Sequence, residues 1–184
     1  EFFWLECGLA LKRAKARTVQ GIAFELNDRV RERIKTMLPF KPTGAQKRVL
    51  AEIAHDMAAP YPMNRLLQGD VGSGKTLVAA EAAIIAIENG YQVALLAPTE
   101  ILASQHYLYF KNLFGKLGYV VLLLTGSNTA REKTQYKRLV SAGLVKLTPT
   151  SAFGSSALAR GQDGGVTAGS PRYLNVSWAP FVPV

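Results

Sequence analysis

Apolar residues near the start of the chain recur at helical spacing. Phe2, Leu5 and Leu9 follow one another at intervals of three and four residues, which predicts a helix over the first residues. A second helix is expected to begin near Asn27-Asp28, whose side chains are typical of helix starts. The first apolar stretch is too short to span a bilayer, so no membrane segment is expected.

Between residues 61 and about 147 the pattern changes to short apolar runs separated by helical segments. The runs predict strands at 63–68, 91–97 and 119–124 and the start of a fourth strand at 144–147. The helical segments between them cover 75–88, 100–114 and 130–143. Continuous apolar strands separated by helices are typical of a parallel sheet with helices on both faces, so we expect an α/β fold.

Three threonines stand where helices are expected to begin. Thr43 precedes Gln46, and Thr129 precedes Glu132, with the spacing of a capping box, in which two residues satisfy each other's backbone N–H groups. Thr99 precedes the helix expected over 100–114 and can cap it with its hydroxyl.

A glycine-rich stretch separates the first predicted strand from the helix that follows it. Its sequence is Gly69-Asp70-Val71-Gly72-Ser73-Gly74-Lys75-Thr76. It matches the P-loop pattern G-x-x-x-x-G-K-[ST], which binds the phosphates of a nucleoside triphosphate. The alternative is a glycine-rich turn with an incidental lysine, and the strand–turn–helix setting argues against it.

The residue types in this motif each have a chemical reason. Gly69, Gly72 and Gly74 allow backbone conformations that place successive N–H groups around an anion. Lys75 is the expected catalytic residue, because its ammonium group can reach the β- and γ-phosphates and offset developing charge. Thr76 is expected to supply a hydroxyl ligand to Mg²⁺. All eight residues belong to the predicted nucleotide site, with Asp70 and Ser73 in structural or peripheral roles.

Hydrolysis of the nucleotide needs a further acidic strand residue for Mg²⁺ and a group that orients the attacking water. After Glu132 the only acidic residue is Asp163, which follows no apolar strand and has no neighbouring glutamate. The sequence therefore predicts a nucleotide-binding site without a Walker B motif.

Composition and charge narrow the class of protein further. Cys7 is the only cysteine and the two histidines lack metal-ligand spacing, which excludes a disulfide framework and a structural zinc site. The net charge is +9, and residues 1–48 hold 11 Lys+Arg against 5 Asp+Glu, so +6 of it lies there. This charge favours a polyanionic partner. The basic helices are then either a DNA-facing brace or a solvated helix face.

Three segments resemble the RecG family, bacterial ATP-dependent DNA helicases of superfamily 2 that remodel forks and Holliday junctions. They are residues 38–46 (LPFKPTGAQ), 69–76 (GDVGSGKT) and 97–106 (APTEILASQH), and the resemblance covers about residues 2–147. It implies a RecA-like lobe, ATP and Mg²⁺ as cofactors, forked or branched DNA as partner, a monomeric state and a place in the bacterial cytoplasm.

The resemblance also implies an adenine contact outside the P-loop. Phe40 and Gln46 fall where the family's Q-motif contacts adenine. For Gln46 the capping box offers a structural role, and both roles can hold, because an amide side chain has several donor and acceptor positions.

Two further motifs of the family contact the DNA backbone. Pro98, Thr99 and Gln105 match motif Ia, and Thr125-Gly126 matches motif Ib. For Thr99 a helix cap alone is an equally open interpretation.

The resemblance divides the chain into basic linker helices over 1–38, an incomplete ATP-binding lobe over 39–147 and a divergent tail over 148–184. In the linker it implies phosphate contacts for basic residues such as Lys12, Arg13 and Arg17. In the tail, Gly, Ser, Ala and Pro make up 19 of 37 residues, and no helical or strand periodicity appears before residues 172–177, which is typical of loop or disorder. The family's GTHAL-like and DEQH motifs do not follow residue 147, and its second motor lobe is missing.

These features lead to one hypothesis and two alternatives. The chain is expected to be part of a RecG-like helicase that binds ATP·Mg²⁺ weakly and hydrolyses it little or not at all. The alternatives are a non-catalytic nucleic-acid-binding fragment, and a small P-loop kinase or other NTPase, for which the required acidic and basic groups are not visible.

Overall fold

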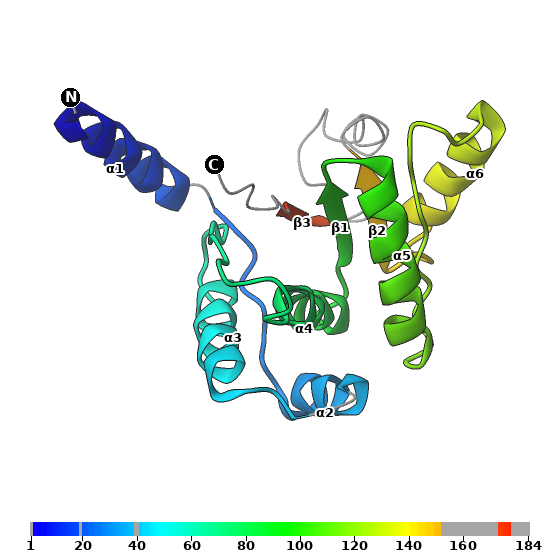
Figure 1. The fold of residues 1–184 in the computed structure, drawn as a ribbon, viewed down its shortest axis with the longest axis horizontal. Helices are drawn as coiled ribbons and strands as arrows, with labels where there is room; N and C mark the ends of the chain where they lie inside the picture. The colour runs from blue at the N-terminus through cyan, green and yellow to red at the C-terminus, as the bar shows by residue number, and fades with distance from the viewer. Residues whose placement is uncertain (1, 19, 39–40, 152–172, 178–184) are drawn as a thin grey trace.

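The computed structural model describes residues 2–18, 20–38, 41–151 and 173–177, with the backbone alone for residues 9, 12, 13, 15–18 and 173–177. The elements in chain order are α1 (Phe2–Thr18), α2 (Asp28–Met37), α3 (Gly44–Met57), α4 (Lys75–Glu88), β1 (Gln92–Ala97), α5 (Glu100–Gly115), α6 (Ala130–Ser141), β2 (Leu147–Ser151) and β3 (Tyr173–Ser177). Figure 1 shows their arrangement. The predicted helices are confirmed, with ends that differ by at most a few residues.

The described strands form a small parallel sheet. Within the described residues the strand order is β2-β1-β3, so β1 is paired on both sides by strands that follow it in the chain (Figure 1). Val93 of β1 lies opposite Leu147 of β2 and Leu174 of β3. The helix α5 contacts β1 and β2, and α4 contacts β1. This part of the chain is therefore mixed α/β, as predicted.

The strand predicted over 63–68 does not form, and this prediction is wrong. Both edges of β1 are already paired, so β1 offers no open edge to this segment. Arg65, in the middle of the segment, instead forms ion pairs with Asp56 and Glu52 of α3. Met63 packs against the apolar core. The segment thus becomes an irregular connection held to α3.

The third predicted strand forms only in part. Isolated parallel bridges join Val121 to Leu147 and Leu124 to Thr150 of β2, without a continuous ladder. Pro149 lies between the two bridged residues of β2 and has no N–H to donate, which interrupts the pairing there.

The fourth predicted strand starts later and runs further than expected. It corresponds to β2, which begins at Leu147 and continues to Ser151, with every residue buried. The β-branched Thr148 and Thr150 suit such a buried strand. This strand contradicts the prediction of loop or disorder for 148–151, whereas β3 lies in the one stretch of the tail with a strand-like pattern. Residues 152–172 and 178–184 lie outside the described residues, and the division of the chain into three parts stays a prediction.

The apolar core surrounds α4. All residues of this helix from Ala80 to Ile87 are buried, as expected of a helix that is apolar on most sides. Both α2 and α3 contact α4, and Phe24, Val30 and Met37 belong to the same core. The segment from residue 24 to α2 therefore packs into the lobe rather than beside it.

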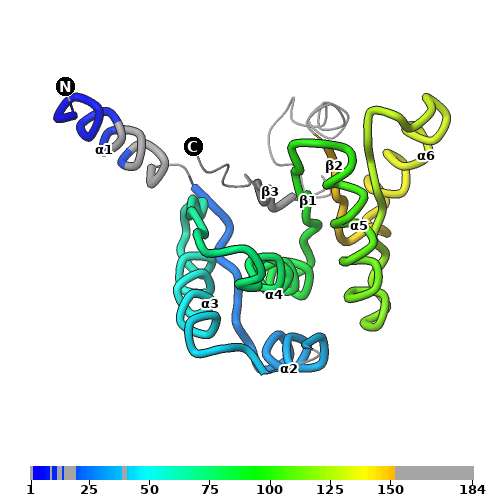
Figure 2. The backbone as a smooth tube through the Cα atoms, viewed as in Figure 1, coloured from blue at the N-terminus to red at the C-terminus, as the bar shows by residue number. Residues whose placement is uncertain are grey.

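The first helix stands apart from this core. In Figures 1 and 2, α1 projects away from the rest of the molecule. The side chains of Phe2, Phe3, Trp4 and Leu11 are 69% to 83% exposed. Among the described residues, no helix combines the length and apolar character needed to cross a membrane.

Candidate nucleotide-binding site

The P-loop segment forms a tight turn before α4. The N–H of Ser73 donates to the carbonyl of Asp70 at 3.2 Å. Gly72 and Gly74 have φ angles of 78° and 84°, a region in which a Cβ is strained. Gly69 has no positive φ, so the backbone reason predicted for it is wrong. A Cβ at Gly69 would instead lie 2.9 Å from Oγ of Ser73, so close approach explains this glycine.

The first turn of α4 meets the loop without a side-chain cap. Gly74 is the N-cap residue, and among the described residues no side chain bonds to the N–H groups that follow it. Uncapped N–H groups and the positive end of the helix dipole favour an anion at this position. This feature of the structure fits a phosphate group.

Lys75 folds its side chain back over the loop. Its ammonium group donates to the carbonyls of Gly69 at 2.7 Å and Asp70 at 2.6 Å, and lies 3.5 Å from Oγ of Ser73. A positive charge is thereby held beside the uncapped end of α4. An ammonium group has three protons, so an anion that enters the loop competes with these carbonyls for them.

Gln46 joins α3 to the loop. Its side-chain oxygen accepts from the N–H of Thr43 at 2.9 Å, which completes the predicted capping box. Its side-chain nitrogen donates to the carbonyl of Ser73 at 3.0 Å. Each amide atom keeps one further hydrogen-bonding position, so the capping role is confirmed and the adenine contact stays a prediction. Phe40, its predicted partner at adenine, lies outside the described residues.

Thr76, the predicted ligand of Mg²⁺, is partly buried at the start of α4. In the part of the chain that the structure describes, no group of three or more His, Cys, Asp or Glu could hold a metal ion. Mg²⁺ commonly keeps several waters and binds phosphate oxygens, so the role predicted for Thr76 does not require a cluster of acidic residues or histidines.

The motif Ia residues lie at the start of α5. Pro98, Thr99 and Gln105 are exposed. The hydroxyl of Thr99 accepts from the N–H of Leu102 at 3.3 Å, so the helix cap is confirmed. A DNA contact at these residues stays a prediction.

The motif Ib residues lie in a turn that is tied to α5. The N–H of Ser127 donates to the carboxylate of Glu100 at 3.1 Å, which brings the two predicted motifs together. Thr125 is 3% exposed, and its hydroxyl lies 2.9 Å from that of Ser127, so its side chain stabilises the turn. Lys133 donates to the carbonyl of Gly126 at 2.7 Å. A DNA contact at Thr125-Gly126 would therefore involve the backbone, and it stays a prediction.

The basic residues of α2 are ion-paired. The pairs are Arg31–Asp28, Lys35–Glu32, Arg29–Glu88 and Arg33–Glu88. For α2 this favours a structural role over the DNA-facing brace. The side chains of the basic residues of α1, namely Lys12, Arg13, Lys15 and Arg17, lie outside the described residues.

Two features of this part of the chain are not predicted from the sequence. The hydrogen bond between Glu100 and Ser127 joins residues 27 positions apart, and no local sequence pattern predicts it. Glu81 is a buried acid within α4, and burial raises its pKa to about 7. The signal for Glu81 was available, because it is the one charged residue between Leu77 and Ile87.

Comparisons with known proteins agree on one family. A family model described as DEAD/DEAH box helicase matches residues 43–161. Curated relatives named ATP-dependent DNA helicase RecG are 49% identical over 135 residues in Escherichia coli strain K12 and 40% identical over 154 residues in Aquifex aeolicus. These alignments cover 73% and 83% of this chain but 20% and 19% of the relatives, so the chain spans about a fifth of their length.

A solved structure gives the same result at the level of the fold. It is described as RecG bound to a three-way DNA junction and matches this chain with a TM-score of 0.73 at 33% sequence identity. The match covers 91% of this chain and 25% of that chain.

Proposed function

Because the chain belongs to the DEAD/DEAH box helicase family, we propose that it is the nucleotide-binding part of a RecG-like ATP-dependent DNA helicase. In this proposal the sheet and its helices form an incomplete RecA-like lobe, and the basic helices before it form a linker. The chain spans about a fifth of the RecG relatives, so fork reversal and branch migration belong to the longer protein.

The P-loop geometry carries this proposal. Two glycines at positive φ, the uncapped first turn of α4 and the ammonium group of Lys75 converge on one loop. Backbone donors and a positive charge in this arrangement bind phosphate groups. When bound, ATP supplies the phosphoanhydride bond whose cleavage drives a helicase.

Three residues of the chain have separate roles in the proposed binding of ATP. Lys75 exchanges its loop carbonyls for phosphate oxygens, and Thr76 offers a hydroxyl to Mg²⁺. Gln46 holds the carbonyl of Ser73 and has one donor and one acceptor position left for the edge of an adenine ring. We expect these 184 residues by themselves to bind ATP weakly, because the family's nucleotide site also uses a second motor lobe.

A titration of fluorescent ATP in the presence of Mg²⁺ tests the proposal. We expect Lys75→Ala to weaken binding at least tenfold, on the order of one lost charge-assisted contact. Lys116→Ala, which removes an exposed lysine at the end of α5, is the matched control and is expected to change binding less than about twofold. Equal affinity of the wild type and Lys75→Ala would overturn the proposal.

A DNA-binding assay separates this proposal from a non-catalytic nucleic-acid-binding fragment. The RecG structure that matches the chain holds a three-way junction, so a branched DNA is the appropriate probe. DNA binding that survives Lys75→Ala and fails when Lys12, Arg13, Lys15 and Arg17 are changed to glutamine would favour the fragment. DNA binding that responds to nucleotide in the wild type, and not in Lys75→Ala, would favour the helicase lobe.

A further inference from the structure

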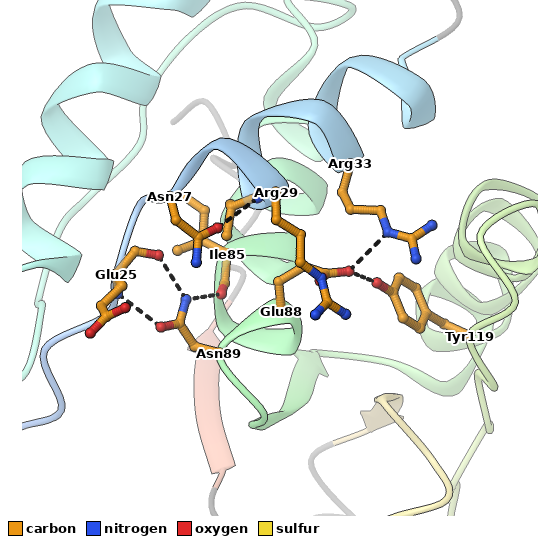
Figure 3. Close-up of polar contacts among 9 residues, drawn as sticks. Glu25, Asn27, Arg29, Arg33, Ile85, Glu88, Asn89 and Tyr119 are labelled. Carbon is orange, nitrogen blue, oxygen red and sulfur yellow. Dashed lines mark hydrogen bonds and ion pairs between the residues drawn. The ribbon is translucent and has the colours of Figure 1, made fainter.

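A polar cluster joins α2 to the end of α4 that lies away from the P-loop (Figure 3). At its centre is Glu88, whose side chain is 2% exposed. The carboxylate lies 2.9 Å from Nε of Arg29 and 3.3 Å from Nε of Arg33. The hydroxyl of Tyr119 donates to the same carboxylate. One buried anion is therefore shared by groups from two other segments of the chain.

The next residue, Asn89, holds the backbone that leads into α2 (Figure 3). Its side-chain oxygen accepts from the N–H of Glu25 at 2.8 Å, and its nitrogen donates to the carbonyl of Glu25 at 3.0 Å. The same nitrogen donates to the carbonyl of Ile85 at 2.8 Å. The amide thus pairs with both backbone groups of one residue, as a neighbouring strand would, while it stays tied to its own helix.

Apolar and backbone contacts extend this attachment towards the start of the segment. The N–H groups of Gly21 and Phe24 donate to the carbonyls of Pro60 and Met57 at 2.8 and 2.9 Å. The buried ring of Phe24 meets the ring of Tyr91 edge-on, with centroids 5.2 Å apart. The segment is therefore attached along its length, and the Glu88–Asn89 cluster contributes ion pairs and side-chain hydrogen bonds.

We propose that Glu88 and Asn89 form a latch that holds residues 20–37 to the far end of α4, so that this segment and the P-loop helix move as one body. The helix runs from Lys75 to Glu88, which places the loop and the latch about 20 Å apart on one rigid element.

The latch depends on the buried charge of Glu88. Surface ion pairs contribute little to stability, but a buried carboxylate that has lost its partners costs much more. Glu88 is the buried member of this cluster, whereas Arg29 and Arg33 are exposed. The pairs of Arg31 and Lys35 lie on the exposed side of the same helix and provide an internal comparison.

Hydrogen exchange on the full 184-residue chain tests the latch. Glu88→Gln keeps the shape of the side chain and removes its charge, and we expect amide exchange in α2 to rise about tenfold or more, with α6 unchanged. Glu32→Gln, which removes the exposed partner of Lys35, is the matched control and is expected to change exchange less than about twofold. Unchanged exchange in α2 of Glu88→Gln, or an equal rise in both variants, would overturn the proposal.

A second set of variants separates the latch from a general loss of folding. Arg29→Gln with Arg33→Gln is prepared alone and in combination with Glu88→Gln. If the three charges act as one unit, amide exchange in α2 rises less in the combined variant than the product of the two separate fold-increases. Multiplicative effects, or exchange in α6 that rises as much as in α2, would contradict the latch. No nucleotide is added, so the result does not depend on the proposed nucleotide site.

Discussion

At the scale of single residues, Gly74 carries two constraints at once. Its φ of 84° disfavours any residue with a Cβ, and a Cβ would also collide with the side-chain nitrogen of Gln46. Gly72 has a similar φ of 78°, but a Cβ there would meet nothing within 4 Å. A comparison of substitutions at the two glycines therefore separates the cost of backbone strain from the cost of losing the contact between α3 and the loop.

We expect Gly74→Ala to destabilise the chain more than Gly72→Ala. Backbone strain costs each variant about 1 kcal/mol, and the displaced Gln46 amide adds about 1 kcal/mol more in Gly74→Ala alone. Urea unfolding of both variants gives the difference in the free energy of unfolding. Equal losses would show that the contact between Gln46 and Ser73 contributes nothing to stability.

Glu81 makes stability depend on pH. Its pKa rises from 4.5 to about 7 because burial disfavours the charged form, so between these values the folded state binds more protons than the unfolded state. Stability from this group is therefore present at low pH and is lost as the pH rises through about 7.

Glu81→Gln is expected to remove this dependence. The variant gains stability relative to the wild type by about 3 kcal/mol between pH 4.5 and about pH 8, because its amide never ionises. Unfolding of both proteins by urea across this range measures the difference, in which the other ionisable groups cancel. A difference that stays flat with pH would contradict the assignment.

At the scale of elements, the helix caps contribute stability that the sequence already indicates. In α6, Thr129 and Glu132 form a complete capping box, and the N–H of Thr129 holds the pKa of the Glu132 carboxyl below its usual value. Thr134, in the same helix, bonds only to the carbonyl of Ala130 one turn earlier. Such back-bonding inside a helix does not stabilise it.

Replacing these two threonines separates a cap from an ordinary hydroxyl. We expect Thr129→Ala to lower the free energy of unfolding by about 1 kcal/mol, and Thr134→Ala to change it by less than about 0.5 kcal/mol. Urea unfolding provides the measurement. A loss as large for Thr134→Ala as for Thr129→Ala would mean that the cap contributes no more to the free energy of unfolding than an ordinary hydroxyl.

The sequence predicts the helices better than the strands for a physical reason. A cap and a helical face are defined by residues within one or two turns, so Thr43, Thr99 and Thr129 are sufficient to locate their helices. A strand needs a partner, and the partner is chosen elsewhere in the chain. The segment 63–68 failed as a strand because β2 and β3 occupy β1 and because Arg65 pairs with α3.

The candidate site shows the same limit. The P-loop lies within eight consecutive residues, and its turn and helix follow from them. The hydrogen bond between Gln46 and Ser73 joins residues 27 positions apart, so only the fold reveals it. The reason for Gly69 was mistaken because it depends on the position of the Ser73 side chain rather than on the backbone of Gly69.

At the scale of the whole molecule, the basic residues among the first 48 fall into two groups, those of α2 and those of α1. The basic residues of α2 are ion-paired with acidic residues of α2 and α4, whereas α1 stands apart from the other helices (Figure 1). The net charge of +9 therefore does not act as one DNA-binding surface. The P-loop holds a separate positive site at Lys75, so a nucleotide and a nucleic acid would bind at different parts of the chain.

Binding and hydrolysis of ATP are expected to separate in this chain. The groups at the P-loop act on the phosphates of the bound ground state, but turnover needs charge stabilisation that is stronger in the transition state. Asp163 is the only acidic residue after Glu132 in these 184 residues, which span about a fifth of the length of the RecG relatives. We therefore expect that release of phosphate by the purified chain equals that of Lys75→Ala, with or without branched DNA, even where fluorescent nucleotide distinguishes the two proteins. DNA-stimulated phosphate release that disappears in Lys75→Ala would show that the chain completes its own catalytic site.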